Sequence, residues 1–342
     1  MALSLAVKYR PTDWSDLTEQ SEVKKILEWQ IENNDVKGAY LFVGGAGTGK
    51  TTSARIFANK INHGEGEPIE LDAASNNGVD DVRLITQQAQ MKSLTGEYRV
   101  FILDEVHMFS QSAWNALLKL LEEPPAKTVF IMCTTEMNKV PKTILSRAQM
   151  YQFNRISQNG IIERLNTILS REQIDTVKQD ALEFLAKSAD GHMRDAITML
   201  DKCLAYSHEL TLKNVVKSIG ATDYETMVRL SKALVYGETQ DMLSVVDKIH
   251  SSGKDFKTFT RSYLSFVLDV CTYSVTRGFE FIKIPNFYKA DLDYLTKYEV
   301  GGTLTKVLKM LMRLNSEIKY DTDPKMLAQA YFYQFCWEVH HG

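Results

Sequence analysis

Cysteine is scarce in this chain of 342 residues, and the few cysteines are widely separated. Cys133, Cys203, Cys271 and Cys336 form no CxxC pair and no metal-ligand spacing. This pattern argues against a zinc module and against a disulfide framework, and it is typical of a reducing compartment.

Long apolar runs and a large excess of one charge are also missing. No run approaches the roughly 18 apolar residues of a membrane span, so we expect no membrane partner. The net charge is −3, and a nucleic-acid site would therefore have to be a local basic surface. With 44% hydrophobic and 24% charged residues, the composition is that of an ordinary globular protein, long enough for two or three domains.

A glycine-rich stretch follows the apolar run 40–43 and precedes a helical pattern over 52–61. It reads Gly44, Gly45, Ala46, Gly47, Thr48, Gly49, Lys50, Thr51 and Thr52. Glycines let backbone N–H groups turn toward a phosphate, Lys50 can reach the β- and γ-phosphates, and the Thr51 hydroxyl can bind Mg²⁺. A flexible surface loop is the alternative, but the complete pattern between a strand and a helix favours a P-loop.

The apolar run 100–103 ends in two adjacent acids, Asp104 and Glu105. Such a run is typical of a buried parallel strand. Asp104 can hold Mg²⁺, commonly through water, and Glu105 can polarise an attacking water molecule. Two acids at a solvated strand end are the alternative. Because a P-loop lies upstream, the pair predicts nucleotide hydrolysis.

Strand and helix patterns alternate through the first half of the chain. We expect strands over 40–43, 68–72, 99–103, 128–134 and 150–153, and helices over 21–33, 52–61, 79–91 and 110–122. The alternation predicts an α/β fold with a parallel, doubly wound sheet.

The strand signals stop at about residue 157. Helical patterns over 157–170, 178–187 and 192–206 predict a small bundle, and those over 211–220, 223–235, 239–252, 255–277 and 302–339 predict a larger one. The aromatic run 331–337 is compatible with base stacking, but a buried terminal helix is the better interpretation.

Several motifs in this order resemble those of a known family. Besides the P-loop, they are Lys8-Tyr9-Arg10-Pro11, Leu71-Asp72-Ala73-Ala74-Ser75, Asp104-Glu105-Val106-His107-Met108, Asn115-Ala116-Leu117-Leu118-Lys119, Leu121-Glu122-Glu123-Pro124-Pro125, Ile144-Leu145-Ser146-Arg147 and Gly191-His192-Met193-Arg194-Asp195-Ala196. They are similar to motifs of the AAA+ motor subunits of bacterial clamp loaders, the gamma/tau subunits of DNA polymerase III. The resemblance covers about residues 8–203, and the remainder matches only in length and helicity. It implies a AAA+ nucleotide-binding domain over 1–155, a helical lid over 156–210 and an oligomerising helical collar over 211–342.

The resemblance also assigns roles in catalysis. Thr135 falls at the sensor 1 position and Arg194 at sensor 2, both near the γ-phosphate, while Tyr9 and Arg10 would line the adenine end. Arg147 falls at the arginine finger that enters a neighbouring subunit's site. A planar guanidinium suits the spread charge of a transferring phosphoryl group, which supports both arginine roles.

Simpler interpretations of these residues remain open from the sequence. Arg147 could form a surface salt bridge, and Arg194 could pair locally with Asp195. Tyr9, with Trp14, could pin a loop to the core.

The family's DNA contacts carry over less completely. Members of the family track one strand of primer-template DNA with residues near helix N-termini, and those positions hold Arg83, Lys119, Lys139 and Thr143 here. Asn76 and Gly78 stand where basic residues occur in the family, which weakens part of the track. Solvated lysines on a helical face are the alternative.

Other departures concern cofactors and length. The bacterial subunits carry a cysteine-rich zinc module after the P-loop helix, whereas residues 62–67 bridge that gap without cysteine. We therefore expect ATP and Mg²⁺ as cofactors and no zinc. Ala148 replaces the cysteine that follows the arginine finger, and the long extension of tau is missing from the chain. A loader pared down in a viral or otherwise reduced replication system would look like this.

The resemblance implies a DNA- and clamp-stimulated ATPase subunit of a sliding-clamp loader. ATP binding would open the clamp and place it on primer-template DNA, and hydrolysis would release it. Expected partners are the sliding clamp, DNA and other loader subunits in a homo- or hetero-pentamer, in the cytoplasm of a bacterium or of a virus-infected host cell.

Three alternatives stay open. A AAA+ motor of the branch-migration type shares the catalytic motifs but usually appends a winged helix, and only helical patterns follow residue 210. A non-hydrolysing structural loader subunit would not need the intact acids and P-loop. A small-molecule kinase would need neither Arg147 nor a collar.

Overall fold

The computed structural model describes residues 3–91, 96–219, 223–297 and 301–341. The chain forms two compact units that divide between Thr211 and Leu212. Within the described part of the chain, no helix is long and apolar enough to cross a membrane.

Unit 1 is built on a five-stranded, wholly parallel sheet with the strand order β2-β3-β4-β1-β5. The strands are β1 (Ala39–Gly44), β2 (Ile69–Asp72), β3 (Arg99–Asp104), β4 (Thr128–Thr134) and β5 (Gln149–Phe153). The predicted parallel α/β sheet is confirmed. Because β4 pairs with both β1 and β3, the carboxyl ends of these three strands lie side by side.

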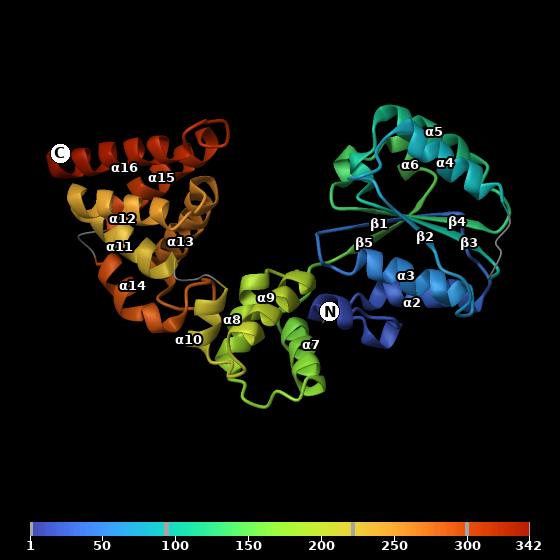
Figure 1. Ribbon diagram of the computed structural model, residues 1–342, viewed down its shortest axis with the longest axis horizontal. Helices are drawn as coiled ribbons and strands as arrows, with labels where there is room; N and C mark the ends of the chain where they lie inside the picture. The colour runs from blue at the N-terminus through green and yellow to red at the C-terminus, as the bar shows by residue number, and fades with distance from the viewer. Residues whose placement is uncertain (1–2, 92–95, 220–222, 298–300, 342) are drawn as a thin grey trace. The chain divides into compact units, whose positions relative to one another are not determined.

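Helices cover both faces of the sheet (Figure 1). One face carries α2 (Ser21–Glu32) and α3 (Lys50–Ile61), and the other carries α4 (Val79–Ala89), α5 (Gln111–Glu122) and α6 (Lys142–Leu145). The side chains of β1 alternate between two cores, as the pleat of a strand requires. Tyr40 and Phe42 pack with the first layer, and Leu41 and Val43 with the second.

The rest of unit 1 is helical. A small bundle contains α7 (Gln158–Arg171), α8 (Gln179–Ala189) and α9 (Met193–Tyr206), and we call these three helices the lid. The short N-terminal helix α1 (Leu5–Lys8) packs against α9, where the Leu5 backbone N–H donates to Asp201 Oδ2 over 3.2 Å. The described residues of this unit also form the short 3-10 helices η1 (Trp14–Asp16), η2 (Val106–Met108) and η3 (Met137–Lys139).

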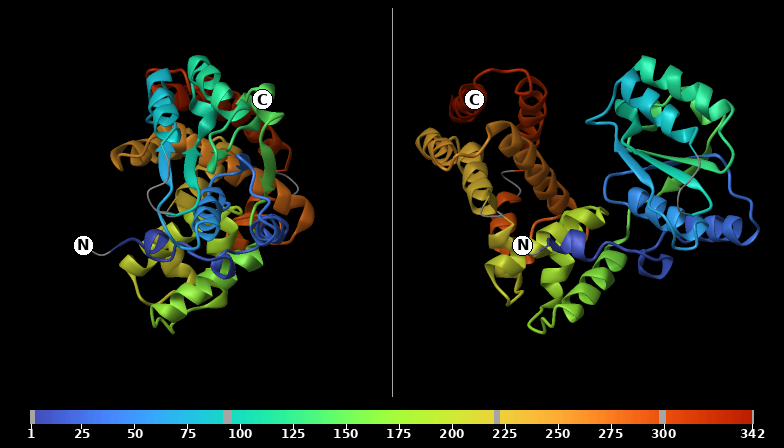
Figure 2. Two further views of the ribbon diagram at one scale, coloured as in Figure 1. Left: turned by 90° about the vertical axis from the view of Figure 1, so that its right-hand side faces the viewer. Right: turned by 45° about the vertical axis from the view of Figure 1, so that its right-hand side comes forward.

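Helices alone make up the described part of unit 2 (Figure 2). They are α10 (Leu212–Ser218), α11 (Asp223–Tyr236), α12 (Thr239–Ser251), α13 (Phe256–Thr276), η4 (Asn286–Tyr288), α14 (Lys289–Leu295), α15 (Gly301–Glu317) and α16 (Pro324–His341). The long helix α13 packs against α15, and its Tyr263 is fully buried. Residue 220, the expected end of a helix, lies outside the described residues.

The expectation of one helix over 302–339 is wrong. The segment forms α15 and α16, which are separated by a turn before Pro324. Proline disfavours helical geometry in the residue before it, and Asp323 Oδ1 accepts a hydrogen bond from the Met326 backbone N–H at 3.0 Å, as a helix N-cap does. Helix α14 was also not expected.

The aromatic run 331–337 lies in α16 and is packed on one face only. Phe332 and Phe335 are buried in the core of unit 2, whereas Tyr333 and Trp337 are about half exposed. The run is therefore a helix that shields the core, and it is not buried on all sides.

Candidate nucleotide-binding site

The candidate site lies where β1, β3 and β4 end. The P-loop follows β1, Asp104 ends β3 and Thr135 follows β4. A cavity of about 480 Å³ opens here. Among its lining residues are Tyr9, Arg10, Ala46, Gly47, Thr48, Gly49, Lys50, Thr51, Thr52, Asp104, Glu105 and Arg194, all expected from the sequence.

Two glycines of the loop, Gly44 and Gly49, are required for different structural reasons. Gly49 precedes α3 with a φ of +101°, a backbone conformation that side chains with a Cβ rarely adopt. Gly44 lies inside the sheet, where an added Cβ would stand 2.4 Å from the Phe153 carbonyl oxygen. Gly44 and Gly45 do not line the cavity, although both were expected at the nucleotide.

Lys50 is a buried cation held by neutral groups. Its side chain is 5% exposed, and Nζ donates to the carbonyl oxygens of Gly44 and Gly45, each over 2.8 Å. Burial lowers the pKa of Lys50. Within the described residues Lys50 has no ion-pair partner, so an anionic ligand in the cavity would supply the missing negative charge.

Thr51 and Asp104 form a pair suited to a magnesium ion. Thr51 Oγ1 donates to Asp104 Oδ2 over 2.6 Å. Mg²⁺ prefers hard oxygen ligands and usually keeps several waters, so one hydroxyl and one carboxylate beside bound phosphates fit it. No group of three or more His, Cys, Asp or Glu that could hold a metal occurs in the part of the chain that is described. The absence of zinc remains a prediction.

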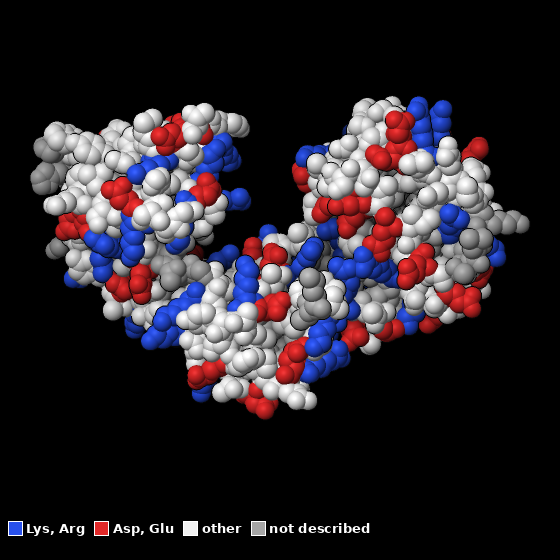
Figure 3. Space-filling model, in the orientation of Figure 1, with Lys and Arg blue, Asp and Glu red and all other residues white. Residues whose placement is uncertain are grey.

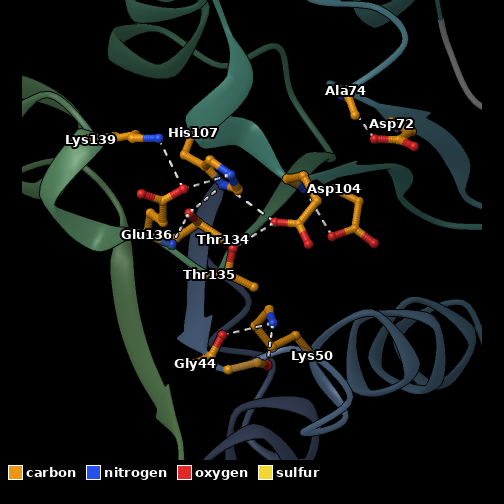
Figure 4. A network of polar contacts seen from close by, with 12 residues as sticks. Gly44, Lys50, Asp72, Ala74, Asp104, His107, Thr134, Thr135, Glu136 and Lys139 are labelled. Carbon is orange, nitrogen blue, oxygen red and sulfur yellow. Dashed lines mark hydrogen bonds and ion pairs between the residues drawn. The ribbon is translucent and has the colours of Figure 1, made fainter. Parts of the chain in front are cut away.

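The carboxylate of Glu105 is held from two sides. Thr135 Oγ1 donates to Glu105 Oε2 over 3.1 Å, and His107 Nδ1 lies 3.3 Å from the same oxygen. The Glu105 backbone adopts a left-handed φ of +49°, and its N–H donates to Asp104 Oδ1 over 3.0 Å. Figure 4 shows Thr135 between Thr134 and Lys50. Thr135 itself does not line the cavity but touches a residue that does.

Two arginines, Arg10 and Arg194, line the cavity. Arg194 is exposed at the start of α9 and forms no ion pair with Asp195 or with any other described residue. Burial, followed by the charges of Arg55 and Arg194, lowers the pKa of Arg10. The start of α9 also contacts the P-loop, since the Met193 backbone N–H donates to the Gly47 carbonyl over 3.1 Å.

Contacts with the lid fix the N-terminal segment. The Tyr9 hydroxyl donates to Glu172 Oε1 over 2.6 Å, and Arg164 Nη2 donates to the Tyr9 carbonyl over 2.7 Å. Tyr9 is buried, so the pinned-loop interpretation describes its contacts here, with the lid as the anchor. The sequence analysis missed Arg164 and Glu172, which belong to no recognisable motif. It also missed Leu17, Ile156 and Ile197, apolar cavity residues from three separate segments.

Arg147 lies away from the cavity of its own chain. Its Nη2 is 2.7 Å from Glu122 Oε1, and its Nη1 donates to the Thr143 carbonyl over 2.8 Å. The surface salt bridge that the sequence left open is therefore present in the single chain. A role in a neighbouring subunit remains a prediction.

The four candidate DNA-contact residues are all exposed, and they lie on α4, α5, η3 and α6. Arg83 pairs with Asp80 at 2.7 Å and Lys139 with Glu136 at 2.9 Å, while Lys119 and Thr143 are exposed on α5 and α6. Figure 3 shows Lys and Arg interspersed with Asp and Glu on the visible face. A phosphate track here would be built from separate residues and not from a continuous basic patch.

Three family models match consecutive parts of the chain. Residues 61–157 match the DNA polymerase III delta subunit model, 160–209 the ATPase lid domain of the DNA polymerase III clamp loader subunit, and 210–333 domain III of the DNA polymerase III subunits gamma and tau. The chain belongs to the gamma/tau family of DNA polymerase III clamp-loader subunits. The family resemblance seen in the sequence is thus confirmed.

Relatives of this gamma/tau family member differ in length. It is 32% identical to DNA polymerase III subunit tau of Bacillus subtilis over 356 residues. The matched region covers 98% of this chain but only 63% of the Bacillus protein. It is 27% identical over 347 residues to DNA polymerase III subunit gamma of Buchnera aphidicola, covering 94% of this chain and 95% of that protein. The chain thus spans less than two thirds of the Bacillus relative.

A solved structure with a similar fold is the RuvB Holliday junction branch migration motor of Thermotoga maritima. The TM-score is 0.54 with 18% sequence identity, over 66% of this chain and 79% of that one. At this identity the likeness shows a shared AAA+ fold and nothing about activity.

Proposed function

We propose that this gamma/tau family chain is the ATPase subunit of a sliding-clamp loader. One observation supports it above the others: a single cavity holds the buried cation Lys50, the Thr51–Asp104 pair and the carboxylate of Glu105. Phosphoryl transfer depends mainly on positioning and charge stabilisation, and these are the groups that it requires.

Each group has a distinct role in this proposal. The P-loop and Lys50 bind the phosphates, Thr51 and Asp104 hold Mg²⁺, and Glu105 orients the attacking water. Thr135 and Arg194 respond to the γ-phosphate. Tyr9 and Arg10, in the N-terminal segment, lie next to the nucleotide. A bound magnesium ion would neutralise charge on the phosphate oxygens.

Arg147 completes the site of an adjacent subunit. The catalytic centre then works fully only in an assembly with other loader subunits, in the cytoplasm where the clamp and primer-template DNA are found. ATP, clamp and DNA must each bind one assembled state more tightly than the other for hydrolysis to be coupled to clamp release.

Two of the three alternatives share features with this chain but are less well supported. A branch-migration motor agrees with the fold of the RuvB neighbour, but residues 210–333 match gamma and tau domain III. A non-hydrolysing scaffold does not require a buried, unpaired Lys50 or the geometry around Glu105.

Steady-state ATP hydrolysis tests the proposal. The purified chain should be measured alone, with primer-template DNA, and with DNA plus the clamp, first by itself and then with the other loader subunits. We expect low basal turnover that rises with DNA and clamp in the assembled particle. An assembly that binds clamp and DNA but never hydrolyses ATP would make this chain a structural subunit.

A further inference from the structure

A buried histidine links the carboxylate of Glu105 to the protein surface. His107 lies in η2, directly after β3, and its side chain is 8% exposed. Its Nδ1 is 3.2 Å from Thr134 Oγ1 and 3.3 Å from Glu105 Oε2, and its Nε2 is 3.4 Å from Glu136 Oε1. Figure 4 shows the imidazole close to both Thr134 and Glu136. Both nitrogens of the ring therefore face carboxylates.

Glu136, on the other side of the imidazole, is itself held in place. The Glu136 backbone N–H donates to Thr134 Oγ1 over 3.0 Å, which anchors the turn after β4. The Glu136 carboxylate also pairs with Lys139 Nζ over 2.9 Å, and that lysine is about half exposed. The sequence of contacts runs from the surface at Lys139 through Glu136 and His107 to Glu105.

Glu105 depends on such support. Its side chain is about one third exposed, so burial alone does not fix its rotamer. A carboxylate that orients water must be held in a narrow range of positions by neighbouring groups. Only Thr135 and His107 contact Oε2 through their side chains within the described residues.

We propose that His107 is a positioning residue that holds Glu105 for catalysis, and that Glu136 in turn holds His107. The Lys139–Glu136 pair is exposed and contributes little to stability, so Lys139 can be replaced while Thr134 keeps the turn in place. This inference rests on the proposed hydrolysis of ATP.

Two substitutions separate the two sides of the ring. An asparagine amide reaches about as far as Nδ1 and a glutamine amide about as far as Nε2, and each can donate a hydrogen bond. His107→Asn therefore keeps a donor toward Glu105, whereas His107→Gln keeps one toward Glu136. His250→Ala, at an exposed histidine of α12, is the matched control.

Kinetics give the first test. We expect His107→Ala to lower kcat about 10- to 100-fold, as is typical when a group that orients a functional side chain is removed. The KM for ATP, the affinity for ADP and the unfolding midpoint should stay at the wild-type values. His107→Asn should recover most of the loss and His107→Gln little of it. A kcat for His107→Ala within twofold of the wild type would overturn the proposal, as would a matching loss of nucleotide affinity.

A spectroscopic test does not depend on turnover. The imidazole ¹⁵N resonances of His107, assigned with the asparagine variant, should shift in Glu136→Gln and in Lys139→Ala. They should not shift in Lys142→Ala, which alters an exposed lysine nearby on α6. Unchanged resonances in both Glu136→Gln and Lys139→Ala would exclude the link. If the wild type hydrolyses no ATP, the proposed function fails, while these spectra still report on the link.

Discussion

Arg147 Nη2 lies 2.7 Å from Glu122 Oε1, so the side chain proposed to act on a neighbouring subunit is paired within its own chain. Both groups are well exposed, and such pairs usually contribute less than about 1 kcal/mol. The contact can therefore hold the guanidinium near α5 without preventing its transfer to a more strongly charged ligand.

Arg147→Ala should lower the stimulated turnover of the assembled particle. We expect a loss of about 10³-fold or more, the range found for arginine fingers, with unchanged ATP affinity. Glu122→Gln should retain the stimulated rate, because it removes only the pairing partner. Arg155→Ala is the control, since Arg155 forms a comparable exposed pair with Asp190. Full stimulation of Arg147→Ala would exclude the finger role.

Asp104→Asn should weaken the binding of ATP in the presence of Mg²⁺. The substitution removes the negative charge beside Thr51 but keeps a similar shape. We expect turnover to fall at least 100-fold, and the gain in ATP affinity on adding Mg²⁺ to shrink. Titration of a fluorescent ATP analogue with and without a chelator measures this gain. An unaltered gain would mean that Asp104 does not support the metal.

Lys119→Ala and Lys139→Ala should weaken DNA binding without changing sequence preference. Each lost phosphate contact reduces the slope of log affinity against log salt by roughly 0.7 to 0.9. Binding isotherms of primer-template DNA at several salt concentrations give this slope. Lys202→Ala, at a residue of α9, serves as the control. Slopes equal to the wild type in both variants would favour the view that these are ordinary solvated lysines.

Tyr263→Phe should destabilise unit 2. The Tyr263 hydroxyl is 2.9 Å from Ser231 Oγ, and both residues are buried. Removing the hydroxyl leaves a buried serine without its partner, at a cost of about 1–3 kcal/mol in the free energy of unfolding. Adding Ser231→Ala should recover part of this cost. Tyr320→Phe is the control, because Tyr320 is 89% exposed. Denaturant unfolding compares the variants.

Glu172 should make the stability of unit 1 sensitive to acid. Hydrogen bonds from Lys8 and Tyr9 lower the pKa of Glu172 below its ordinary value of 4.5. A carboxyl whose pKa is lowered on folding adds stability above that value, and the contribution is lost as the pH falls through the folded-state pKa. Glu172→Gln should thus be less stable than the wild type at pH 7, by a difference that shrinks below about pH 4.5.

Urea unfolding of both proteins between pH 3 and 7 measures this difference. Glu32→Gln, at an exposed residue ending α2, is the matched control. A difference between Glu172→Gln and the wild type that stays constant down to pH 3 would contradict the assignment.

Motif spacing made the cavity predictable from the sequence. The P-loop and the two acids at the end of β3 each have a required local setting, and parallel strands bring their carboxyl ends to one edge of the sheet. Contacts between distant segments were not predictable in this way. Tyr9 and Glu172 are 163 residues apart, and Glu122 and Arg147 meet only because α5 and the segment after α6 lie together.

The error at residues 302–339 has a different origin. Helical periodicity continues through the turn, and it outweighed the local signal of Asp323 followed by Pro324. The network around His107 was also visible only in part, since the motif contains the histidine but gives no indication of Glu136.

Two buried cysteines can report on the opening of each unit of the protein. Cys133 lies in the central strand β4 of unit 1, and Cys336 lies in α16 of unit 2. Burial raises the pKa of Cys133 and raises that of Cys336 to about 11, so neither thiol reacts readily while its unit stays closed. Brief alkylation followed by peptide mapping would therefore time the opening of each unit separately, with no foreign probe attached.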